Sequence, residues 1–255
     1  MIPLKTSKEA DKIRAAGKIA AGARKLAGEL IRPGITTKQI DRELRAFIKS
    51  NGAVPSSLNY NGFPAAICMS VNEEVIHGIP GPRKLKDGDI VDVDVAACLD
   101  GWHADCCSTF LVGECDSEAK RLVQVCRESF FAALEFAQKG CRIGDISRAV
   151  QKYVEERGFT IVREYVGHGV GREYHEEPEV PNFEDPKHKG VRLLPGMVLA
   201  IEPMINMGTE ETVVLADGWT VVTKDGKYSA HYENTVLITD GDAEILTPID
   251  GDGFA

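Results

Sequence analysis

Carboxylate side chains with the spacing of a metal site stand in one short stretch of the chain, from Asp89 to Thr109. Within it, three valines alternate with three other residues: Val91, Val93 and Val95 with Asp92, Asp94 and Ala96. This period of two predicts a strand with the valines on one face and the carboxylates on the other. Aspartate is depleted in strands, and two like charges on one face repel each other unless a positive charge lies nearby.

The dipeptide Asp100-Gly101 predicts a two-residue hairpin turn within this stretch. Counting outward from the turn places Ala96 opposite Asp105 and Asp94 opposite Cys107. Asp94 and Asp105 are then diagonal neighbours on one face, with Cβ atoms roughly 7–8 Å apart. Such a gap suits one or two metal ions. A solvated hairpin face is the ordinary alternative, and the strand pattern alone leaves both interpretations open.

Three further residues are candidate metal ligands. His168 is framed by glycines in 165–171, which let backbone and ligand come close to the imidazole. Glu202 ends the apolar run 197–201, and Glu233 has the same position on a later predicted strand. Each of these residues also has an ordinary explanation when it is considered alone. His168 could lie in a surface turn, and each acid could form an ion pair with a Lys or Arg.

Ion pairs explain these acids poorly as a group, because no Lys or Arg falls within the strand segments that carry them. The candidates are four carboxylates and one imidazole, namely Asp94, Asp105, His168, Glu202 and Glu233. An oxygen-rich set with one nitrogen favours hard or borderline divalent ions such as Mn, Fe(II), Co or Zn. Two such ions would balance four negative charges.

Four amphipathic helices are predicted around the strands. Capping signals place them from Thr6–Glu9 to Pro33-Gly34, from Thr36-Thr37 to Asn51-Gly52, from Asp116-Ser117 to Gln138, and from Asp145 to near Gly158. Residues 65–77 and 89–112 are predicted strands.

The two helix pairs repeat one another. Six residues of the first pair match six of the second at a constant offset of 106: Gly34, Ile40, Leu44, Phe47, Ile48 and Gly52 with Gly140, Ile146, Val150, Tyr153, Val154 and Gly158. Gly88, Ile90 and Asp94 match Gly196, Val198 and Glu202 at an offset of 108. This self-similarity predicts two pseudo-twofold-related helix-helix-strand halves, roughly 1–112 and 113–255. We therefore predict one α+β domain spanning 1–255, in which Asp94 and Glu202 approach a shared axis.

The composition is that of an ordinary globular protein, with 255 residues, 43% hydrophobic and 27% charged. No apolar run approaches the length of a membrane-spanning helix and no signal peptide is recognised, so a cytoplasmic protein without a membrane partner is expected. The seven cysteines form no CxxC pair and are expected to be reduced thiols.

The net charge of −9 is unevenly distributed. The first fifty residues contain 12 Lys/Arg and 5 Asp/Glu, a balance of +7, and the remaining residues carry −16. A basic terminal segment could make transient contact with ribosomal RNA where new chains emerge. It is also what the solvent side of two helices looks like, and we favour that interpretation.

Taken together, several motifs resemble the type I methionine aminopeptidases, which have the pita-bread fold. The motifs run nearly end to end: Asn72-Glu-Glu-Val-Ile-His-Gly-Ile-Pro80, the strand with Asp94, His103-Ala-Asp105, Gly167-His-Gly-Val-Gly171, His175-Glu-Glu-Pro178, Ile201-Glu-Pro-Met204 and Tyr232-Glu-Asn-Thr235. The resemblance implies that the two halves pack around a central antiparallel sheet.

The resemblance also implies roles for the candidate residues. Two divalent metal ions (Co, Mn, Fe(II) or Zn) would be held by Asp94, Asp105, His168, Glu202 and Glu233, with Asp105 and Glu233 bridging them. They would activate water and polarise the scissile carbonyl. Glu202 would transfer protons, His175 would stabilise the oxyanion, and His77 would contact the scissile nitrogen.

A methionine pocket is implied for seven residues: Tyr60, Phe63, Cys68, His77, Tyr174, His175 and Trp219. Aromatic rings and a thiol suit a polarizable thioether, although aromatics are also ordinary core residues. The chain departs from the usual pattern at Cys106-Cys107, where hydroxyl residues are common, at Asp92, where Asn is common, and at Phe63, where Tyr is frequent. By the hairpin count, Asp92 shares the metal-facing side.

The expected function is removal of the initiator methionine from new chains whose second residue is small, by a monomer with no DNA partner. An X-Pro aminopeptidase or prolidase is the first alternative, although such relatives carry an extra N-terminal domain. A metal-free pita-bread binding protein is the second, although such proteins lose the metal ligands that are all present here. The spacing from Glu202 to Glu233 leaves no room for the helical insertion of type II enzymes.

Overall fold

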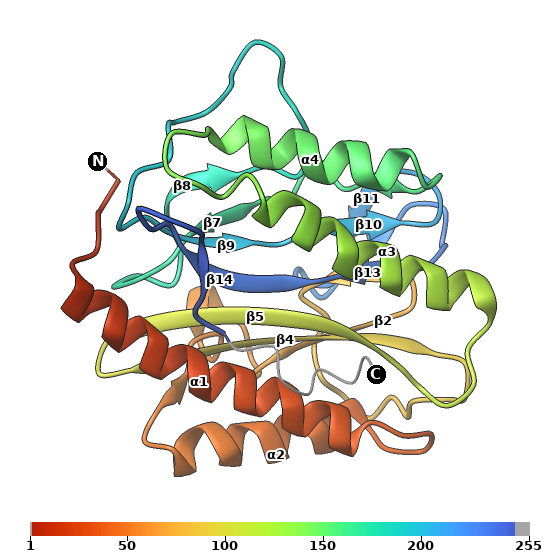
Figure 1. The fold of residues 1–255 in the computed structure, drawn as a ribbon. Coiled ribbons are helices and arrows are strands. Elements are labelled where there is room, and N and C mark those ends of the chain that lie inside the picture. The colour runs from red at the N-terminus through yellow and green to blue at the C-terminus, as the bar shows by residue number, and fades with distance from the viewer. Residues whose placement is uncertain (1, 248–255) are drawn as a thin grey trace.

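The computed structural model describes residues 2–247 (Figure 1). Its helices form two pairs, α1 (Ser7–Leu30) with α2 (Thr37–Ser50), and α3 (Ser117–Leu134) with α4 (Ile143–Glu155). The capping box predicted for α1 is confirmed, because the Thr6 hydroxyl accepts the Glu9 N–H and the Glu9 carboxylate accepts the Thr6 N–H. None of the described helices is long and apolar enough to cross a membrane.

The prediction for the end of α3 was wrong by four residues, since the helix stops at Leu134 rather than at Gln138. Beyond it the chain tightens, and the amides of Phe136 and Ala137 donate to carbonyls three residues back, at 2.9 and 3.0 Å. Ala137 is fully buried, so the apolar pattern continues past the last helical residue.

The predicted start of α4 was also wrong, because the helix begins at Ile143, two residues before Asp145. Asp145 is the third helical residue, and its carboxylate accepts the Arg142 N–H at 2.8 Å. In the sequence, an Asp at the third helical position looks the same as an Asp at the N-cap position. The helix was therefore predicted to begin too late.

The predicted hairpin is confirmed by strands β4 (Ile90–Leu99) and β5 (Trp102–Leu111). Their register pairs Asp94 with Cys107 and Ala96 with Asp105, as the outward count from the turn requires. The turn residues Asp100 and Gly101 have φ values of 52° and 75°, which match a type I′ turn.

Strands from both halves join in one nine-stranded sheet, and every pairing in it is antiparallel. Its main path is β1 (Val54–Pro55), β4, β5, β14 (Glu233–Leu237), β9 (Val198–Ile201), β7 (Gly167–Gly169) and β8 (Glu176–Val180). Two short strands lie off this path: β2 (Cys68–Val71) pairs with β4, and β15 (Glu244–Ile245) pairs with β14. The sheet therefore crosses the boundary between the halves where β5 meets β14.

Two three-stranded sheets complete the fold. One contains β13 (Ser229–His231), β10 (Met204–Asn206) and β6 (Thr160–Ile161), and the other β11 (Thr212–Val214), β12 (Val221–Thr223) and β3 (Glu74–Ile76). A short 3-10 helix, η1 (Tyr60–Gly62), lies between β1 and β2 in the chain.

The internal repeat is visible in the backbone. Gly34 and Gly140, 106 residues apart, have φ values of 90° and 93°, and Gly88 and Gly196 both have 90°. Gly34 and Gly140 each donate their N–H to the carbonyl three residues before Gly88 and Gly196 respectively, at 2.7 and 3.1 Å. Only glycine adopts such φ values without strain, so the matched glycines mark matched turns.

The strands of the sheet run between the two helix pairs in Figure 1, with α3 and α4 above them and α1 and α2 below. The valine face of β4 packs with α1 and α2 in one apolar cluster, which includes Val91, Val93 and Val95. A second cluster joins α3 and α4 to β9, β10 and β14. Because the valines face the helices, Asp92 and Asp94 face the other way, as the alternation predicts.

Candidate metal centre

A cavity of about 160 Å³ opens where the two halves meet. The first half supplies residues of β3, β4 and β5, and the second supplies residues of β7, β13 and β14 and the segments beside them. The lining residues are Ile76, His77, Asp94, Asp105, Tyr165, Val166, His168, Tyr174, His175, Glu202, His231 and Glu233. All five predicted metal ligands therefore face one space.

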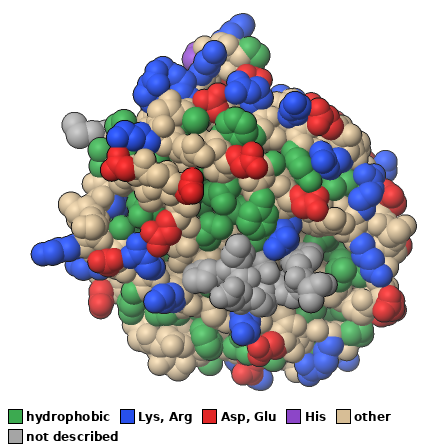
Figure 2. Space-filling model, in the orientation of Figure 1, with side chains coloured by type: hydrophobic (Ala, Val, Ile, Leu, Met, Phe, Trp, Pro, Cys, Tyr) green, Lys and Arg blue, Asp and Glu red, His purple; other side chains and the backbone are tan. Residues whose placement is uncertain are grey.

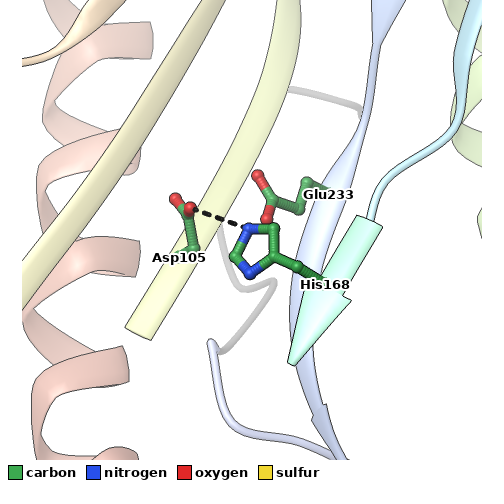
Figure 3. Close-up of side chains that lie close together, drawn as sticks. All are labelled: Asp105, His168 and Glu233. Carbon is green, nitrogen blue, oxygen red and sulfur yellow. Dashed lines mark ion pairs between the residues drawn. The ribbon is translucent and has the colours of Figure 1, made fainter. Parts of the chain in front are cut away.

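Three of these residues could share a single ion. One ligand atom each of Asp105, His168 and Glu233 lies within 4.8 Å of the others, and all three residues are buried. Figure 3 shows the three side chains converging from β5, β7 and β14. The dashed line joins Nε2 of His168 to Oδ2 of Asp105, 3.9 Å apart.

The other two acids adjoin this group. Asp94 and Asp105 are diagonal neighbours on β4 and β5 and line the same cavity, and burial together with repulsion from Asp94 raises the pKa of Asp105. Glu202 follows the last residue of β9, and its Oε1 lies 3.6 Å from Nε2 of His168. The ring nitrogen of His168 is therefore close to carboxylates on two sides.

The histidine is oriented as a ligand. Nδ1 of His168 lies 2.8 Å from the carbonyl oxygen of Gly169. Since a carbonyl oxygen only accepts, we assign the proton to Nδ1, which leaves the lone pair of Nε2 directed toward the acids. The flanking glycines allow this placement, because a Cβ at Gly167 or Gly169 would lie 2.4 or 2.3 Å from a backbone oxygen of a neighbouring strand.

The electrostatics of the cluster call for a positive charge. Burial raises the pKa of all four carboxyl groups, and repulsion from neighbouring acids contributes to each increase: Asp94, Asp105, Glu202 and Glu233. One oxygen on each of three of them is buried without a hydrogen-bond partner: Asp94 Oδ1, Asp105 Oδ1 and Glu233 Oε1. Among residues 2–247, only histidines lie within ion-pair distance of these acids. The donor set therefore fits divalent cations.

Two neutral imidazoles flank the acids. His77 follows β3 with a φ of 58°, an uncommon backbone conformation for a residue with a side chain. Burial, with a smaller effect of nearby His231, lowers the pKa of His77 to about 4. His175 lies at the exposed rim, where its Nδ1 is 2.9 Å from the Tyr60 hydroxyl and its ring centre is 4.1 Å from that of His168, with the two rings tilted by 49°.

The predicted methionine pocket is divided between the cavity and its immediate surroundings. Tyr174 lines the cavity, and its ring contacts Tyr60 at 4.9 Å. Phe63 and Trp219 meet edge to face at 5.2 Å, and Cys68 is the backbone partner of Asp94 in the pairing of β2 with β4. Tyr60, Phe63, Cys68 and Trp219 thus adjoin the cavity but do not line it.

None of the three sequence departures lines the cavity, although one of them, Phe63, adjoins it. Asp92 shares the strand face of Asp94, as expected, but it does not line the cavity. Its Oδ1 accepts hydrogen bonds from the Thr109 hydroxyl and the His231 N–H. The thiols of Cys106 and Cys107 point at backbone carbonyls, 3.7 and 3.8 Å away.

The sequence reasoning missed His231, which lines the cavity and is 2% exposed. A signal for it exists, because His231 precedes Glu233 by two residues and a period of two places both on one side of an extended chain. The residues Ile76, Tyr165 and Val166, inside or beside the quoted motifs, were also not singled out.

Comparison with known proteins gives consistent matches. The sequence pattern of metallopeptidase family M24 matches residues 11–240. The methionine aminopeptidase of Clostridium perfringens is 53% identical over 249 residues, which is 98% of this chain and 100% of that protein. The crystal structure of methionine aminopeptidase from Rickettsia prowazekii covers 97% of this chain and 100% of its own, with a TM-score of 0.95 and 40% identity. The resemblance and the pita-bread fold expected from the motifs are confirmed.

A more distant structure bears on the first alternative. The prolidase from Pyrococcus furiosus matches with a TM-score of 0.79 and 24% identity, and covers 97% of this chain and 66% of its own. At this identity the likeness shows the fold alone.

Proposed function

Since the chain belongs to metallopeptidase family M24 and, within it, to the methionine aminopeptidases, we propose that it removes the initiator methionine from new chains whose second residue is small. Membership in this family makes it a metal-dependent hydrolase. The observation that carries the proposal is the buried group of Asp105, His168 and Glu233, with Asp94 and Glu202 on the same cavity.

We propose that the five ligands hold two divalent ions, with Asp105 and Glu233 shared between them. Four carboxylates with three unpartnered buried oxygens support two charges of +2 better than one. The oxygen-rich donor set suits Mn, Fe(II), Co or Zn. When bound, the ions would supply Lewis acidity and an activated water.

Glu202 is the proposed proton-transfer residue. Its carboxyl group lies on the cavity beside the other four ligands, where it can take up a proton and later release it. In the metal-free protein, burial raises its pKa to about 8. The backbone of Glu202 is anchored, because the side chain of Asn182 donates to its carbonyl at 2.8 Å. The proton would pass from the attacking water to the leaving amine.

His175 and His77 are the proposed donors to the substrate. If Nδ1 of His175 accepts the Tyr60 hydroxyl proton across their 2.9 Å contact, Nε2 carries a proton and can donate to a developing oxyanion. His77 lines the same cavity, and we propose that it contacts the scissile nitrogen. Neither role requires an imidazolium.

The methionine side chain would lie against the aromatic rings and the thiol beside the cavity. Trp219 links the two parts of this surface, since its ring lies 5.2 Å from that of Phe63 and 6.3 Å from that of His77. Cys68 and Phe63 belong to one apolar cluster. Polarizable, apolar walls favour an unbranched thioether.

We also propose a single catalytic domain that acts as a monomer in the cytosol, with the N-terminal methionine of new peptides as its partner and no DNA or membrane partner. The single domain is supported by the central sheet, which both halves share. All seven cysteines are free thiols, as expected in a reducing compartment.

We also propose that the first fifty residues make transient contact with the ribosome. Nine basic residues there are exposed: Lys8, Lys12, Lys18, Lys25, Arg32, Lys38, Arg42, Arg45 and Lys49. On the face drawn in Figure 2, however, Lys/Arg and Asp/Glu side chains are interspersed rather than gathered in one patch. This mixture of charges supports the interpretation that the basic residues mainly form the solvent-exposed side of the first two helices.

The test is a peptide assay with purified protein loaded with Mn²⁺ or Co²⁺. Cleavage of Met-Ala-Ser is expected, and Glu202→Ala should reduce the rate by at least about 100-fold, as the loss of general acid–base catalysis does. An Ala-Pro peptide tests the prolidase alternative. No cleavage of Met-Ala-Ser, or an unchanged rate in Glu202→Ala, would contradict the proposal, and calorimetry without metal binding would favour the binding-protein alternative.

A further inference from the structure

His231 is a buried imidazole at the cavity that the proposed mechanism does not use. It ends β13, pairs with Met204 of β10, and is 2% exposed. Its Nε2 lies 3.5 Å from Oε2 of Glu202 and has no hydrogen bond among the residues that the structure describes.

Hydrogen bonds of the main chain fix the position of the His231 side chain. The His231 N–H donates to the Thr109 hydroxyl at 3.0 Å and lies 3.3 Å from Oδ1 of Asp92. Its carbonyl accepts from the Cys107 thiol at 3.8 Å. With the main chain held on both sides, the imidazole has little freedom other than rotation about its own bonds.

Glu202 has an imidazole on each side. Nε2 of His168 lies 3.6 Å from Oε1, and Nε2 of His231 lies 3.5 Å from Oε2. The two oxygens of one carboxylate therefore face different partners. Oε1 faces His168 of the ligand group, and Oε2 faces His231 on β13.

An unsatisfied polar atom in this environment is costly. A buried donor without a partner loses its hydrogen bonds to water and gains none in return, and Nε2 of His231 lies only 3.5 Å from a carboxylate oxygen. This oxygen, Oε2 of Glu202, could accept a hydrogen bond from it. A donor to a ligating acid fixes the orientation of that acid.

We propose that His231 is a positioning residue, whose neutral Nε2–H donates to Oε2 of Glu202 and so keeps Oε1 directed at the metal ligands. This inference rests on the proposed function of the site and adds a residue that orients its proton-transfer acid. Without the donor, the carboxylate would rotate, so the site would bind its ions less tightly and turn over more slowly.

The test compares His231→Leu, which removes the donor, with His231→Gln, whose amide can still donate. Manganese binding is measured by titration calorimetry on metal-stripped protein, and kcat and KM on Met-Ala-Ser. His231→Leu should weaken Mn²⁺ binding and lower kcat, each by about 10- to 100-fold, with KM within about 2-fold. His231→Gln should restore both to within about 5-fold of the parent, since the donor is retained.

A double-mutant cycle with Glu202→Gln shows whether the two residues act as one unit. In the Glu202→Gln background, His231→Leu should no longer change the Mn²⁺ affinity, because the acceptor carboxylate is gone. Should the Leu variant not fold, His231→Asn takes its place with the same expected losses, because its amide is too short to reach Glu202.

The inference is overturned if His231→Leu keeps both Mn²⁺ affinity and kcat within about 2-fold, or if the Gln variant is as impaired as the Leu variant. Additive effects in the cycle would also overturn it. If the parent protein binds Mn²⁺ but cleaves no peptide, the proposed function fails, while the calorimetric comparison still decides the role of His231.

Discussion

Lys5, in the segment before α1, forms a buried ion pair with Glu176, the residue that follows His175. The side chains are only 4% and 9% exposed. The other carboxylate oxygen of Glu176 accepts the N–H groups of Arg172 and Glu173, at 2.7 and 3.2 Å. This ion pair connects the segment before α1 to the loop that carries His175. Lys5, far from His175 in the sequence, therefore helps to hold a proposed hydrogen-bond donor to the substrate in place.

Replacing Lys5 with Met should disturb this loop. Removing one partner of a buried pair leaves the other charge uncompensated, which typically costs about 3–5 kcal/mol. We expect a lower melting temperature and a fall of about 10-fold in kcat/KM on Met-Ala-Ser, with Mn²⁺ affinity unchanged because the metal ligands lie elsewhere. The double variant Lys5→Met/Glu176→Gln removes both charges and should recover part of the stability. No recovery would mean that packing of the Lys5 side chain, rather than its charge, holds the loop.

Two equally buried aspartates, Asp105 and Asp92, allow a matched comparison of their effects on metal binding. Asp105→Asn removes a charge from the group of Asp105, His168 and Glu233 and should lower Mn²⁺ affinity by at least about 10-fold. Asp92→Asn removes an equally buried charge that does not line the cavity, and the metal content should stay the same. Calorimetry and elemental analysis of both variants check this. Equal losses would show that the overall charge of the strand, and not ligation, controls the affinity.

Metal-free protein should lose stability as the pH rises from about 6.5, the ordinary value for histidine, to the Glu202 pKa of about 8. The folded-state pKa of the buried carboxyl groups is raised, so the native state binds more protons than the unfolded chain in this window. Each such group lowers the free energy of unfolding by up to about 1.4 kcal/mol per pH unit. Buried histidines with lowered pKa values, such as His231 at about 3, act in the opposite direction only below about 6.5.

The measurement is the melting temperature in a chelator across this pH range, with excess Mn²⁺ as the comparison. Bound ions keep the carboxylates ionised, so the decrease with pH should disappear in Mn²⁺. Glu202→Gln removes one titrating group and should flatten the chelator curve. A metal-free protein that is equally stable at both ends of the range would argue against protonated acids in the cavity.

Because the turns at Gly34 and Gly140 match, we expect the same substitution to lower the free energy of unfolding equally at both. Gly34 and Gly140 have φ values of 90° and 93°, and no heavy atom lies within 4 Å of a Cβ built at either position. Gly34→Ala and Gly140→Ala should therefore each lower the free energy of unfolding through backbone strain alone, by about 1–2 kcal/mol. Urea unfolding of both variants provides the test. A clear difference between them would show that the two halves contribute unequally to the cooperative unit.

Much of the architecture follows from local patterns in the sequence. The Asp100-Gly101 turn and the valine alternation determined the register of β4 and β5, and hence the diagonal placement of Asp94 and Asp105. These features are local, because a turn type specifies the pairing on either side of it and a period of two specifies the face. The end of α3 was not predictable in this way, since an apolar residue contributes the same pattern whether it is the last of a helix or the first of a turn.

The sequence by itself determined the residue types of the site, the strands that carry its acids, and the twofold repeat that brings the halves together. Only the tertiary structure decided which side chains share the cavity: that Asp92 bonds to Thr109 behind it, that His231 faces Glu202, and that Lys5 neutralises Glu176. The physical reason is distance along the chain. Contacts between residues tens to more than a hundred positions apart depend on how whole elements pack, and no local periodicity encodes them.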